Sequence, residues 1–192
     1  MARTVVVTGI PGVGASRVCE RTRRRLGDEY TLVNVGDVMV ESALEHGLAD
    51  TRDGLADLPP RDQRLLQRRA GEHVARKSAE GPLIVNTHLV VHTDAGFLPG
   101  LPGDVRMEMD PSVLVVVDAE PETILRRRAG TERTYPNDGR SVVEFHQQLQ
   151  SAAALTYSAT DGIPIRHVDN DDDLEVAVDD LVAIAEEATA ER

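Results

Sequence analysis

A glycine-rich segment near the start of the chain, Gly9-Ile10-Pro11-Gly12-Val13-Gly14-Ala15-Ser16, restricts the possible folds more than any other sequence feature. It follows an apolar, β-branched run, Thr4–Thr8, and precedes an amphipathic pattern over Ser16–Leu26. A strand, such a turn and a helix in this order are the context of a phosphate-binding loop of the form G-x-x-x-x-G-K-[ST]. Backbone N–H groups of such a loop and the helix N-terminus surround an anion. The segment therefore predicts a phosphate site with the Ser16 hydroxyl as a ligand for Mg²⁺; the alternative is an ordinary glycine-rich turn.

One position departs from this motif, because Ala15 stands where the motif has lysine. That lysine contacts the β- and γ-phosphates and offsets the charge that develops during phosphoryl transfer. We therefore expect that arginines elsewhere in the chain supply this charge, or that catalysis is weaker.

Five β-branched runs alternate with helical patterns along the chain. Several runs are almost continuously apolar, as in strands buried on both faces, and the alternation predicts an α/β fold with a parallel sheet and helices on both faces. The expected strands are Thr4–Thr8, Thr31–Val35, Leu83–Asn86, Val113–Asp118 and Pro164–Val168. The expected helices are Ser16–Leu26, Val38–His46, Pro60–Ala79, Pro121–Arg128, Val142–Ser158 and Asp172–Ala188.

Three further features complete the expected organisation. The helix Val142–Ser158 carries apolar residues on one side, namely Phe145, Leu149, Ala152 and Leu155. The least regular stretches are His88–Asp110 and Gly130–Arg140, both rich in glycine and proline. Long irregular segments in a compact α/β domain are usually lids or binding loops, so we expect these two to be functional.

Polar residues stand at the ends of the second and third expected strands. In a doubly wound sheet the carboxyl ends of the strands line the ligand crevice. After Asn34, Asp37 is interpreted either as the N-cap of the next helix or as part of an acceptor pocket. The run Asn86-Thr87-His88 is placed to position Mg²⁺, water or substrate, and His88 either contacts a phosphate or satisfies backbone groups.

Arginines provide candidate phosphate ligands away from the glycine-rich segment. Arg52 is interpreted either as a bidentate ligand of an acceptor phosphate or as a solvated surface residue. The triplet Arg126-Arg127-Arg128 ends a short helix, and Arg133 and Arg140 follow it. These cations either complement the helix dipole or belong to a lid that closes over the phosphates.

The charge balance argues against several classes of partner. With 21 basic and 33 acidic residues, the formal net charge is -12, which disfavours binding to nucleic acid or to an anionic membrane surface. Lys77 is the single lysine. Abundant acid with almost no lysine fits a halophilic protein built for a salt-rich interior; a codon bias that replaces lysine by arginine is the alternative. The acidic run Asp169–Asp173 is expected to be a solvated loop that caps a helix.

Cysteine usage and the apolar runs indicate the compartment. Cys19 is the single cysteine, so an internal disulfide is impossible, and its place in the first helix predicts a buried, inert thiol. The sequence has no apolar run of the length that a membrane span needs and no signal-peptide pattern at its start. We therefore expect a cytoplasmic protein without a membrane partner.

Taken together, these motifs resemble the archaeal-type adenylate kinase family, one of the P-loop nucleoside monophosphate kinases. The similarity runs from the first strand to the last helix, and two segments make it specific. The residues that carry it are Val6 to Gly14, Val33-Asn34 with Gly36, Arg52-Asp53, Thr87-His88, Gly96-Phe97-Leu98-Pro99-Gly100-Leu101-Pro102 and Ala152-Ala153-Ala154-Leu155-Thr156-Tyr157. The Leu-Pro-Gly-Leu-Pro segment and the Ala-rich helix with Thr-Tyr are the specific ones.

The resemblance implies a P-loop NTPase-like three-layer sandwich over residues 1–192, with a five-stranded parallel sheet. It implies an acceptor-binding insertion at about 36–60, a lid at about 129–141, a homotrimer, and the reaction Mg·ATP + AMP ⇌ 2 ADP. Gly9 to Ser16 and Arg17 would hold the ATP phosphates, with Mg²⁺ at Ser16. Asp37, Arg52, Thr87 and His88 would bind the acceptor, and Arg127 and Arg133 would stabilise the transferring group.

The chain also departs from this family at charged positions. The family usually has Asp at the position of Asn86 and Arg at that of Ser151, and its Arg-Asx-Arg lid pattern is reduced to Arg133-Thr134-Tyr135. Two alternatives follow from these changes: a P-loop kinase for another small acceptor, or a nucleotide-binding protein with little catalysis.

Overall fold

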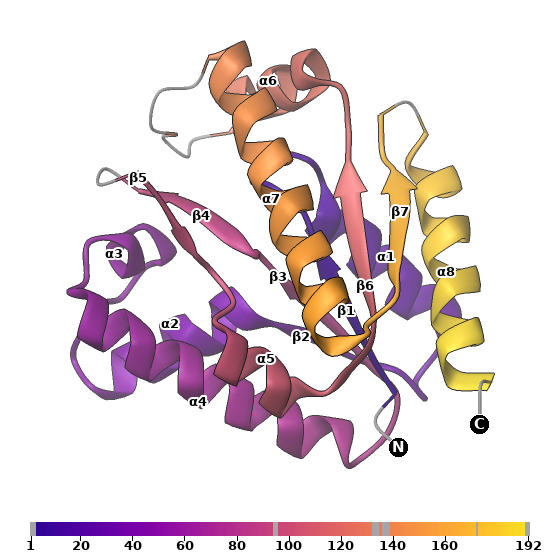
Figure 1. Cartoon of the computed structure of the whole chain (residues 1–192), viewed down its shortest axis with the longest axis horizontal. Helices are drawn as coiled ribbons and strands as arrows, with labels where there is room; N and C mark the ends of the chain where they lie inside the picture. Colours follow the sequence, from indigo (N-terminus) through magenta and orange to yellow (C-terminus); the bar gives the residue numbers. More distant parts are fainter. Residues whose placement is uncertain (1–2, 94–95, 132–134, 136–138, 172, 191–192) are drawn as a thin grey trace.

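A single parallel sheet organises the chain in the computed structural model, which describes residues 3–93, 96–131, 135, 139–171 and 173–190. Its strand order is β2-β3-β1-β6-β7 (Figure 1). The strands are β1 (Thr4–Thr8), β2 (Thr31–Asn34), β3 (Leu83–Thr87), β6 (Pro111–Asp118) and β7 (Ile165–Asp169). This confirms the predicted five-stranded sheet, with strand ends shifted by one or two residues.

Helices cover both faces of this sheet and complete the three-layer sandwich. The helices are α1 (Ala15–Leu26), α2 (Val35–Glu45), α3 (Arg52–Ala56), α4 (Pro60–Ser78), α5 (Gly103–Met109), α6 (Pro121–Ala129), α7 (Arg140–Asp161) and α8 (Leu174–Ala190). α1 and α8 pack on one face, whereas α4, α5 and α7 pack on the other (Figure 1). Side chains of a strand alternate between the faces. Accordingly, Val5 and Val7 lie in one core and Val6 lies in the other.

The stretch 88–110, expected to be irregular, is largely ordered, and this corrects the sequence-based expectation. It contains an antiparallel hairpin of β4 (Val90–Thr93) and β5 (Gly96–Pro99), followed by α5. Gly96, Pro99, Gly100 and Pro102 interrupt the apolar pattern of this stretch, and glycine and proline are typical signals of turns and loops. The chain then passes so close to itself that a Cβ on Gly100 would lie 2.4 Å from the His88 carbonyl oxygen.

α7 contacts the sheet through a different side from the apolar one in the sequence. Phe145 and Leu155 are 50% and 65% exposed. The side chains that α7 buries are Val143, His146, Gln150 and Ala154. Polar residues can face inward here because His146 and Gln150 hydrogen-bond to the backbone of Val90, and Gln150 also donates to the Thr8 hydroxyl.

A buried ion pair joins α5 to the end of α7. Arg106 is 4% exposed and binds the carboxylate of Asp161. Its guanidinium lies 3.8 Å from the ring centroid of Tyr157, whose hydroxyl donates to the Leu101 carbonyl oxygen across 2.5 Å. Burial raises the pKa of the Tyr157 hydroxyl, so it remains a donor at neutral pH. These contacts hold the segment after the hairpin against α7.

Candidate functional site

The glycine-rich loop lies between β1 and α1, as its sequence predicts. Gly12 and Gly14 have φ values of +92° and +94°, in the left-handed region that a side chain would strain. Ile10 and Val13 are buried in the core and anchor the loop from below. Ser16, in the first turn of α1, is exposed to the cleft in front of the loop.

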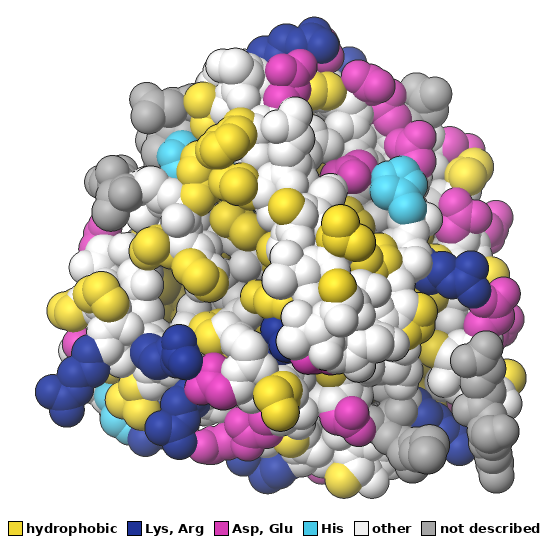
Figure 2. Space-filling model, in the orientation of Figure 1, with side chains coloured by type: hydrophobic (Ala, Val, Ile, Leu, Met, Phe, Trp, Pro, Cys, Tyr) yellow, Lys and Arg dark blue, Asp and Glu magenta, His cyan; other side chains and the backbone are white. Residues whose placement is uncertain are grey.

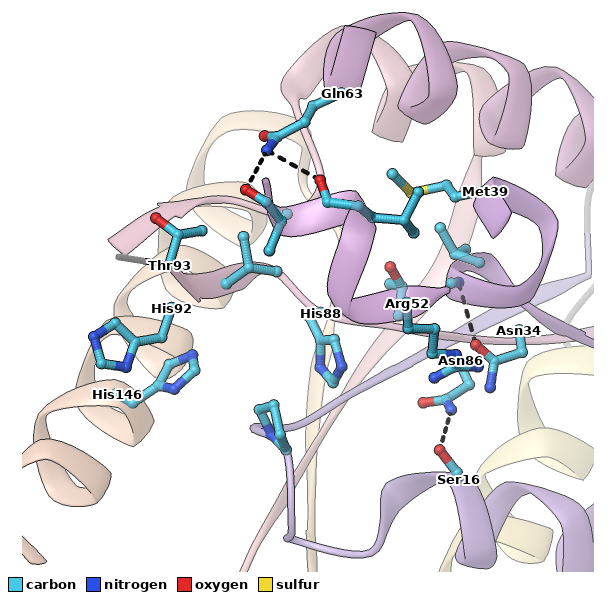
Figure 3. Close-up of a pocket in the computed structure, with 18 of the residues that line it drawn as sticks. Ser16, Asn34, Met39, Arg52, Gln63, Asn86, His88, His92, Thr93 and His146 are labelled. Carbon is cyan, nitrogen blue, oxygen red and sulfur yellow. Dashed lines mark hydrogen bonds between the residues drawn. The ribbon is translucent and has the colours of Figure 1, made fainter. Parts of the chain in front are cut away.

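Asn86, at the end of β3, reaches the first turn of α1. Its side-chain amide donates to Ser16 Oγ across 2.8 Å (Figure 3). The amide is almost completely buried, with 6% of the residue exposed. Parallel strands end at the same edge of the sheet, which explains how residues 70 positions apart meet.

The phosphate loop is braced from behind by two side chains that converge on one carbonyl oxygen. Arg127 in α6 donates to the Val13 carbonyl oxygen at 2.9 Å and to that of Asn170 at 2.8 Å. Asn170 Nδ2 donates to the same Val13 oxygen at 2.8 Å. Burial lowers the pKa of the Arg127 guanidinium. Arg127 therefore contacts the loop's backbone, whereas Arg133, the other predicted catalytic arginine, lies outside the described residues.

Asn170 is a residue that sequence reasoning missed. The acidic run was interpreted as a solvated loop with a helix cap, and Asp173 does accept a hydrogen bond from the Glu175 N–H. Asn170, however, is 2% exposed, and together with Arg127 it binds the Val13 carbonyl oxygen of the phosphate loop. The available signal was that it alone interrupts a run of aspartates.

The acceptor side of the cleft begins with the turn into α2. Asn34 Oδ1 accepts a hydrogen bond from the Gly36 N–H at 3.2 Å, so Asn34 is the N-cap and the cap interpretation of Asp37 is wrong. Asp37 instead binds Arg52, with 2.5 Å from Oδ1 to Nη2 and 3.1 Å to Nε. The guanidinium lies directly over Gly36, where a Cβ would come within 3.2 Å of Cζ. Arg52 is thus held at the wall of the cleft.

Thr87 and His88 lie between the loop and this acceptor side. Thr87 is buried at the end of β3. His88 Nδ1 lies 2.6 Å from the Gly9 carbonyl oxygen; because that oxygen can only accept, Nδ1 carries the hydrogen. His88 therefore satisfies a backbone group of the loop while its ring also lines the cleft (Figure 3).

One continuous cleft connects all these parts. It is lined by Ser16, Asn86, Thr87 and His88 and by Arg52, and Arg17 lies exposed nearby on α1. It also includes Arg128 from the arginine triplet, and six residues that the sequence did not mark as site residues, namely Met39, Gln63, Gln67, His92, Tyr135 and His146. These come from α2, α4, the hairpin and the region of α6 and α7, so their convergence depends on the tertiary fold.

The donor groups at the phosphate loop fit Mg²⁺ bound together with a nucleotide. Mg²⁺ usually takes one or two protein oxygens and completes its shell with phosphates and waters. Ser16 Oγ is exposed at the loop and held in place by Asn86. Within the part of the chain that the structure describes, no group of three or more His, Cys, Asp or Glu side chains could hold a metal alone.

Sequence comparison places this cleft in a known family. The chain is 41% identical to the adenylate kinase of Methanothermobacter thermautotrophicus over 187 residues, which cover 96% of this chain and 100% of that protein. The chain belongs to the adenylate kinase family. Adenylate kinases of Methanopyrus kandleri (40% identity, 95% and 97% covered) and Pyrococcus furiosus (35%, 100% and 99%) are further relatives. The resemblance inferred from the motifs is confirmed, and the chain is a nucleoside monophosphate kinase.

Two further comparisons agree with the P-loop kinase fold of this adenylate kinase family member. Residues 8–144 match the model of a family described as an AAA domain. A sugar kinase from Janibacter sp. HTCC2649 superimposes with a TM-score of 0.57 at 18% identity, covering 99% of this chain and 98% of the other. A gluconokinase from Sinorhizobium meliloti gives a TM-score of 0.53 at 16% identity, covering 97% and 95%.

Two remaining expectations from the sequence concern Cys19 and membrane association. Cys19 is completely buried in the core on the α1 side, and burial raises the pKa of its thiol, as an inert residue requires. Among the described helices, none combines the length and the apolar character needed to cross a bilayer.

Proposed function

We propose that the cleft transfers the terminal phosphoryl group of Mg·ATP to the phosphate of AMP and so produces two ADP. The observation that supports this most directly is the single cleft that joins Ser16 of the phosphate loop to Arg52 of the acceptor side. A direct transfer requires donor and acceptor phosphates side by side in one space from which water is excluded. The same arrangement serves the reverse reaction.

On the donor side, backbone N–H groups from Gly9 to Ser16 would hold the ATP phosphates, and Arg17 lies exposed at the same helix end. Mg²⁺ held by Ser16 Oγ would supply positive charge that offsets the negative charge of the ATP phosphates. Arg127 and Asn170 keep the loop in its shape through Val13, and we expect Arg133 to act on the transferring group from the lid at about 129–141.

On the acceptor side, we propose that the insertion at about 36–60 binds AMP. The Arg52 fork would bind the AMP phosphate, exchanging its exposed partner Asp37 for the doubly charged ligand. Thr87 and His88 would line the space where the two phosphates meet. An oxygen of the AMP phosphate then attacks the γ-phosphorus; one P–O bond forms, and the bond to the bridging oxygen breaks with its electron pair on ADP.

We also propose a cytoplasmic homotrimer. The trimer and the compartment follow from the family resemblance, and the exposed apolar side of α7 supports association between copies of the chain, with Phe145 half exposed and Leu155 two-thirds exposed. Figure 2 shows apolar side chains gathered over the N-terminal part of α7 and the adjoining hairpin. Light scattering at several protein concentrations tests the stoichiometry, and a monomer throughout would contradict it.

A coupled assay of ADP formation tests the proposed reaction. Mg·ATP is supplied with AMP, and then with other nucleoside monophosphates in its place, at low and at molar KCl. We expect AMP to be the best acceptor. ADP formation no faster than in the absence of AMP would overturn the proposal, and a clearly better acceptor would redirect it to another small substrate.

A further inference from the structure

The phosphate loop lacks the cation that its motif normally carries. Ala15, at the lysine position, is 6% exposed, and its methyl group packs beneath the loop near Gly9. A buried methyl group supplies no charge to a phosphate. If the proposed phosphoryl transfer takes place here, the missing positive charge must come from another side chain that reaches the same space.

The arginines around the loop differ in where their guanidinium groups lie. Arg126 donates to the Thr123 hydroxyl at the surface. Arg140 is bound by two glutamates. Arg127 is directed at backbone carbonyl groups behind the loop. Among the described residues, the arginines that line the cleft are Arg52, on the acceptor side, and Arg128.

Arg128 lies against the outer turn of the phosphate loop. Its Nε–H donates to the Pro11 carbonyl oxygen across 2.8 Å, and the residue is 6% exposed. It passes so close to Gly12 that a Cβ there would lie 2.8 Å from Arg128 Cγ and 3.0 Å from Nε. The guanidinium carbon lies 4.7 Å from the ring centroid of Tyr135. The backbone, the glycine and the aromatic ring together fix the position of this charge.

We propose that Arg128 supplies the positive charge that Ala15 cannot supply and that it binds the phosphoryl group during transfer; this inference rests on the proposed function. A cation that is already oriented and shielded from water stabilises developing phosphate charge without further reorganisation. Guanidinium also matches phosphate geometry and keeps its charge when buried. Gly12 then has two roles, since it allows both the turn of the loop and the close approach of Arg128.

The test first removes the charge at Arg128 and then restores a positive charge at position 15 of the phosphate loop. Arg128→Ala removes the guanidinium, and the double variant Arg128→Ala with Ala15→Lys replaces the charge without restoring the Pro11 contact. We expect Arg128→Ala to lower kcat for ADP formation about 1,000-fold or more, as for other arginines that stabilise a transferring phosphoryl group. The double variant should regain at least about tenfold, which is close to 1.4 kcal/mol of transition-state stabilisation. Arg166→Ala is the control, because Arg166 is exposed on β7 and paired with Glu187.

Calorimetric ATP affinity and thermal unfolding of each variant complete the experiment. An Arg128→Ala protein with kcat near wild type would overturn the inference while the proposed reaction stands. So would a folded Arg128→Ala protein whose loss Ala15→Lys does not repair, since Arg128 would then only support the loop. If wild type binds ATP but forms no ADP, the proposed function fails. The Arg128 inference is then decided by ATP affinity alone. Affinity that weakens in Arg128→Ala and recovers in the double variant would still uphold Arg128 as a phosphate ligand, and unchanged affinity would overturn that role.

Discussion

Asn86 donates its side-chain amide to Ser16 Oγ across 2.8 Å, from the end of β3 to the first turn of α1. An amide donor occupies one lone pair of the hydroxyl that is expected to bind Mg²⁺. A carboxylate at the same position would instead accept the Ser16 hydrogen and leave the oxygen lone pairs directed at the cation. It would also add negative charge near the metal.

Asn86→Asp should therefore tighten the binding of Mg²⁺ in the presence of nucleotide, by about tenfold for a gain near 1.4 kcal/mol. Calorimetric titration of Mg²⁺ into the protein with ADP measures this, and the Mg²⁺ dependence of kcat should shift to lower concentration in parallel. Asn86→Ala is the control that removes the hydrogen bond without adding charge. Equal Mg²⁺ affinity in wild type and Asn86→Asp would show that the interaction has no bearing on the metal.

Arg127 and Asn170 both donate to the Val13 carbonyl oxygen, so both are expected to stabilise the phosphate loop. Arg127→Ala should lower the free energy of unfolding by about 2–3 kcal/mol, since it removes charged hydrogen bonds to carbonyl oxygens. ATP affinity should fall with it. Urea unfolding and calorimetry measure the two quantities, and a double-mutant cycle with Asn170→Ala should show coupling. Strict additivity would mean that the two side chains do not act on the loop together.

Arg52 is expected to recognise the acceptor phosphate. Arg52→Ala should raise the KM for AMP about 30-fold, a loss near 2 kcal/mol for a charge-assisted contact, with little change in the KM for ATP. Arg52→Lys should recover part of this, because lysine lacks the bidentate fork. Arg64→Ala is a matched control, since Arg64 is exposed on α4 and paired with Asp104. An equal rise in both KM values would argue that Arg52 supports the fold of the cleft as a whole.

His146 makes stability depend on pH. Burial, together with the charge of the nearby Arg128 guanidinium, lowers the pKa of His146 from 6.5 to about 4. Between those pH values the unfolded chain binds a proton that the folded chain excludes, so stability must fall as pH decreases from about 6.5 to 4, by about 3 kcal/mol from this group.

The comparison that isolates this effect is wild type against His146→Gln, whose amide can still donate to the Val90 carbonyl oxygen. Denaturant unfolding is measured at intervals from pH 7 to 4. The difference in free energy of unfolding between the two proteins should change over this range, because other groups titrate equally in both. A constant difference would show that folding leaves the pKa of His146 unchanged.

The acidic surface predicts that salt stabilises the fold. Figure 2 shows acidic side chains gathered over the loop between β7 and α8 and along α8. With a net charge of -12, self-repulsion should decrease as KCl approaches molar concentration, where the Debye length falls to about 3 Å. A gain of about 2–3 kcal/mol would raise the unfolding midpoint by roughly 5–10 °C. Sucrose at equal osmolality is the control, and a midpoint that KCl leaves unchanged would contradict salt adaptation.

The sheet and the phosphate loop could be predicted from the sequence because their signals are local. Apolar, β-branched runs such as Thr4–Thr8 have few alternatives to a buried strand, and the glycines at 12 and 14 before Ser16 permit a loop conformation that other residues would strain. The ends of parallel strands share one edge of the sheet, so Asn86 could be expected to face the loop before its partner was known.

Only the tertiary structure decided which side chains meet across the cleft. Arg127 and Arg128 are adjacent in the sequence, yet one guanidinium lies behind the loop and the other lines the cleft, because successive helical residues point about 100° apart. The sequence did not reveal which side of α7 is buried either. His146 and Gln150 look solvent-facing in the sequence and become core residues because unpaired backbone groups of β4 are there to bond them. Such contacts join residues dozens of positions apart, and local patterning does not encode the distance between them.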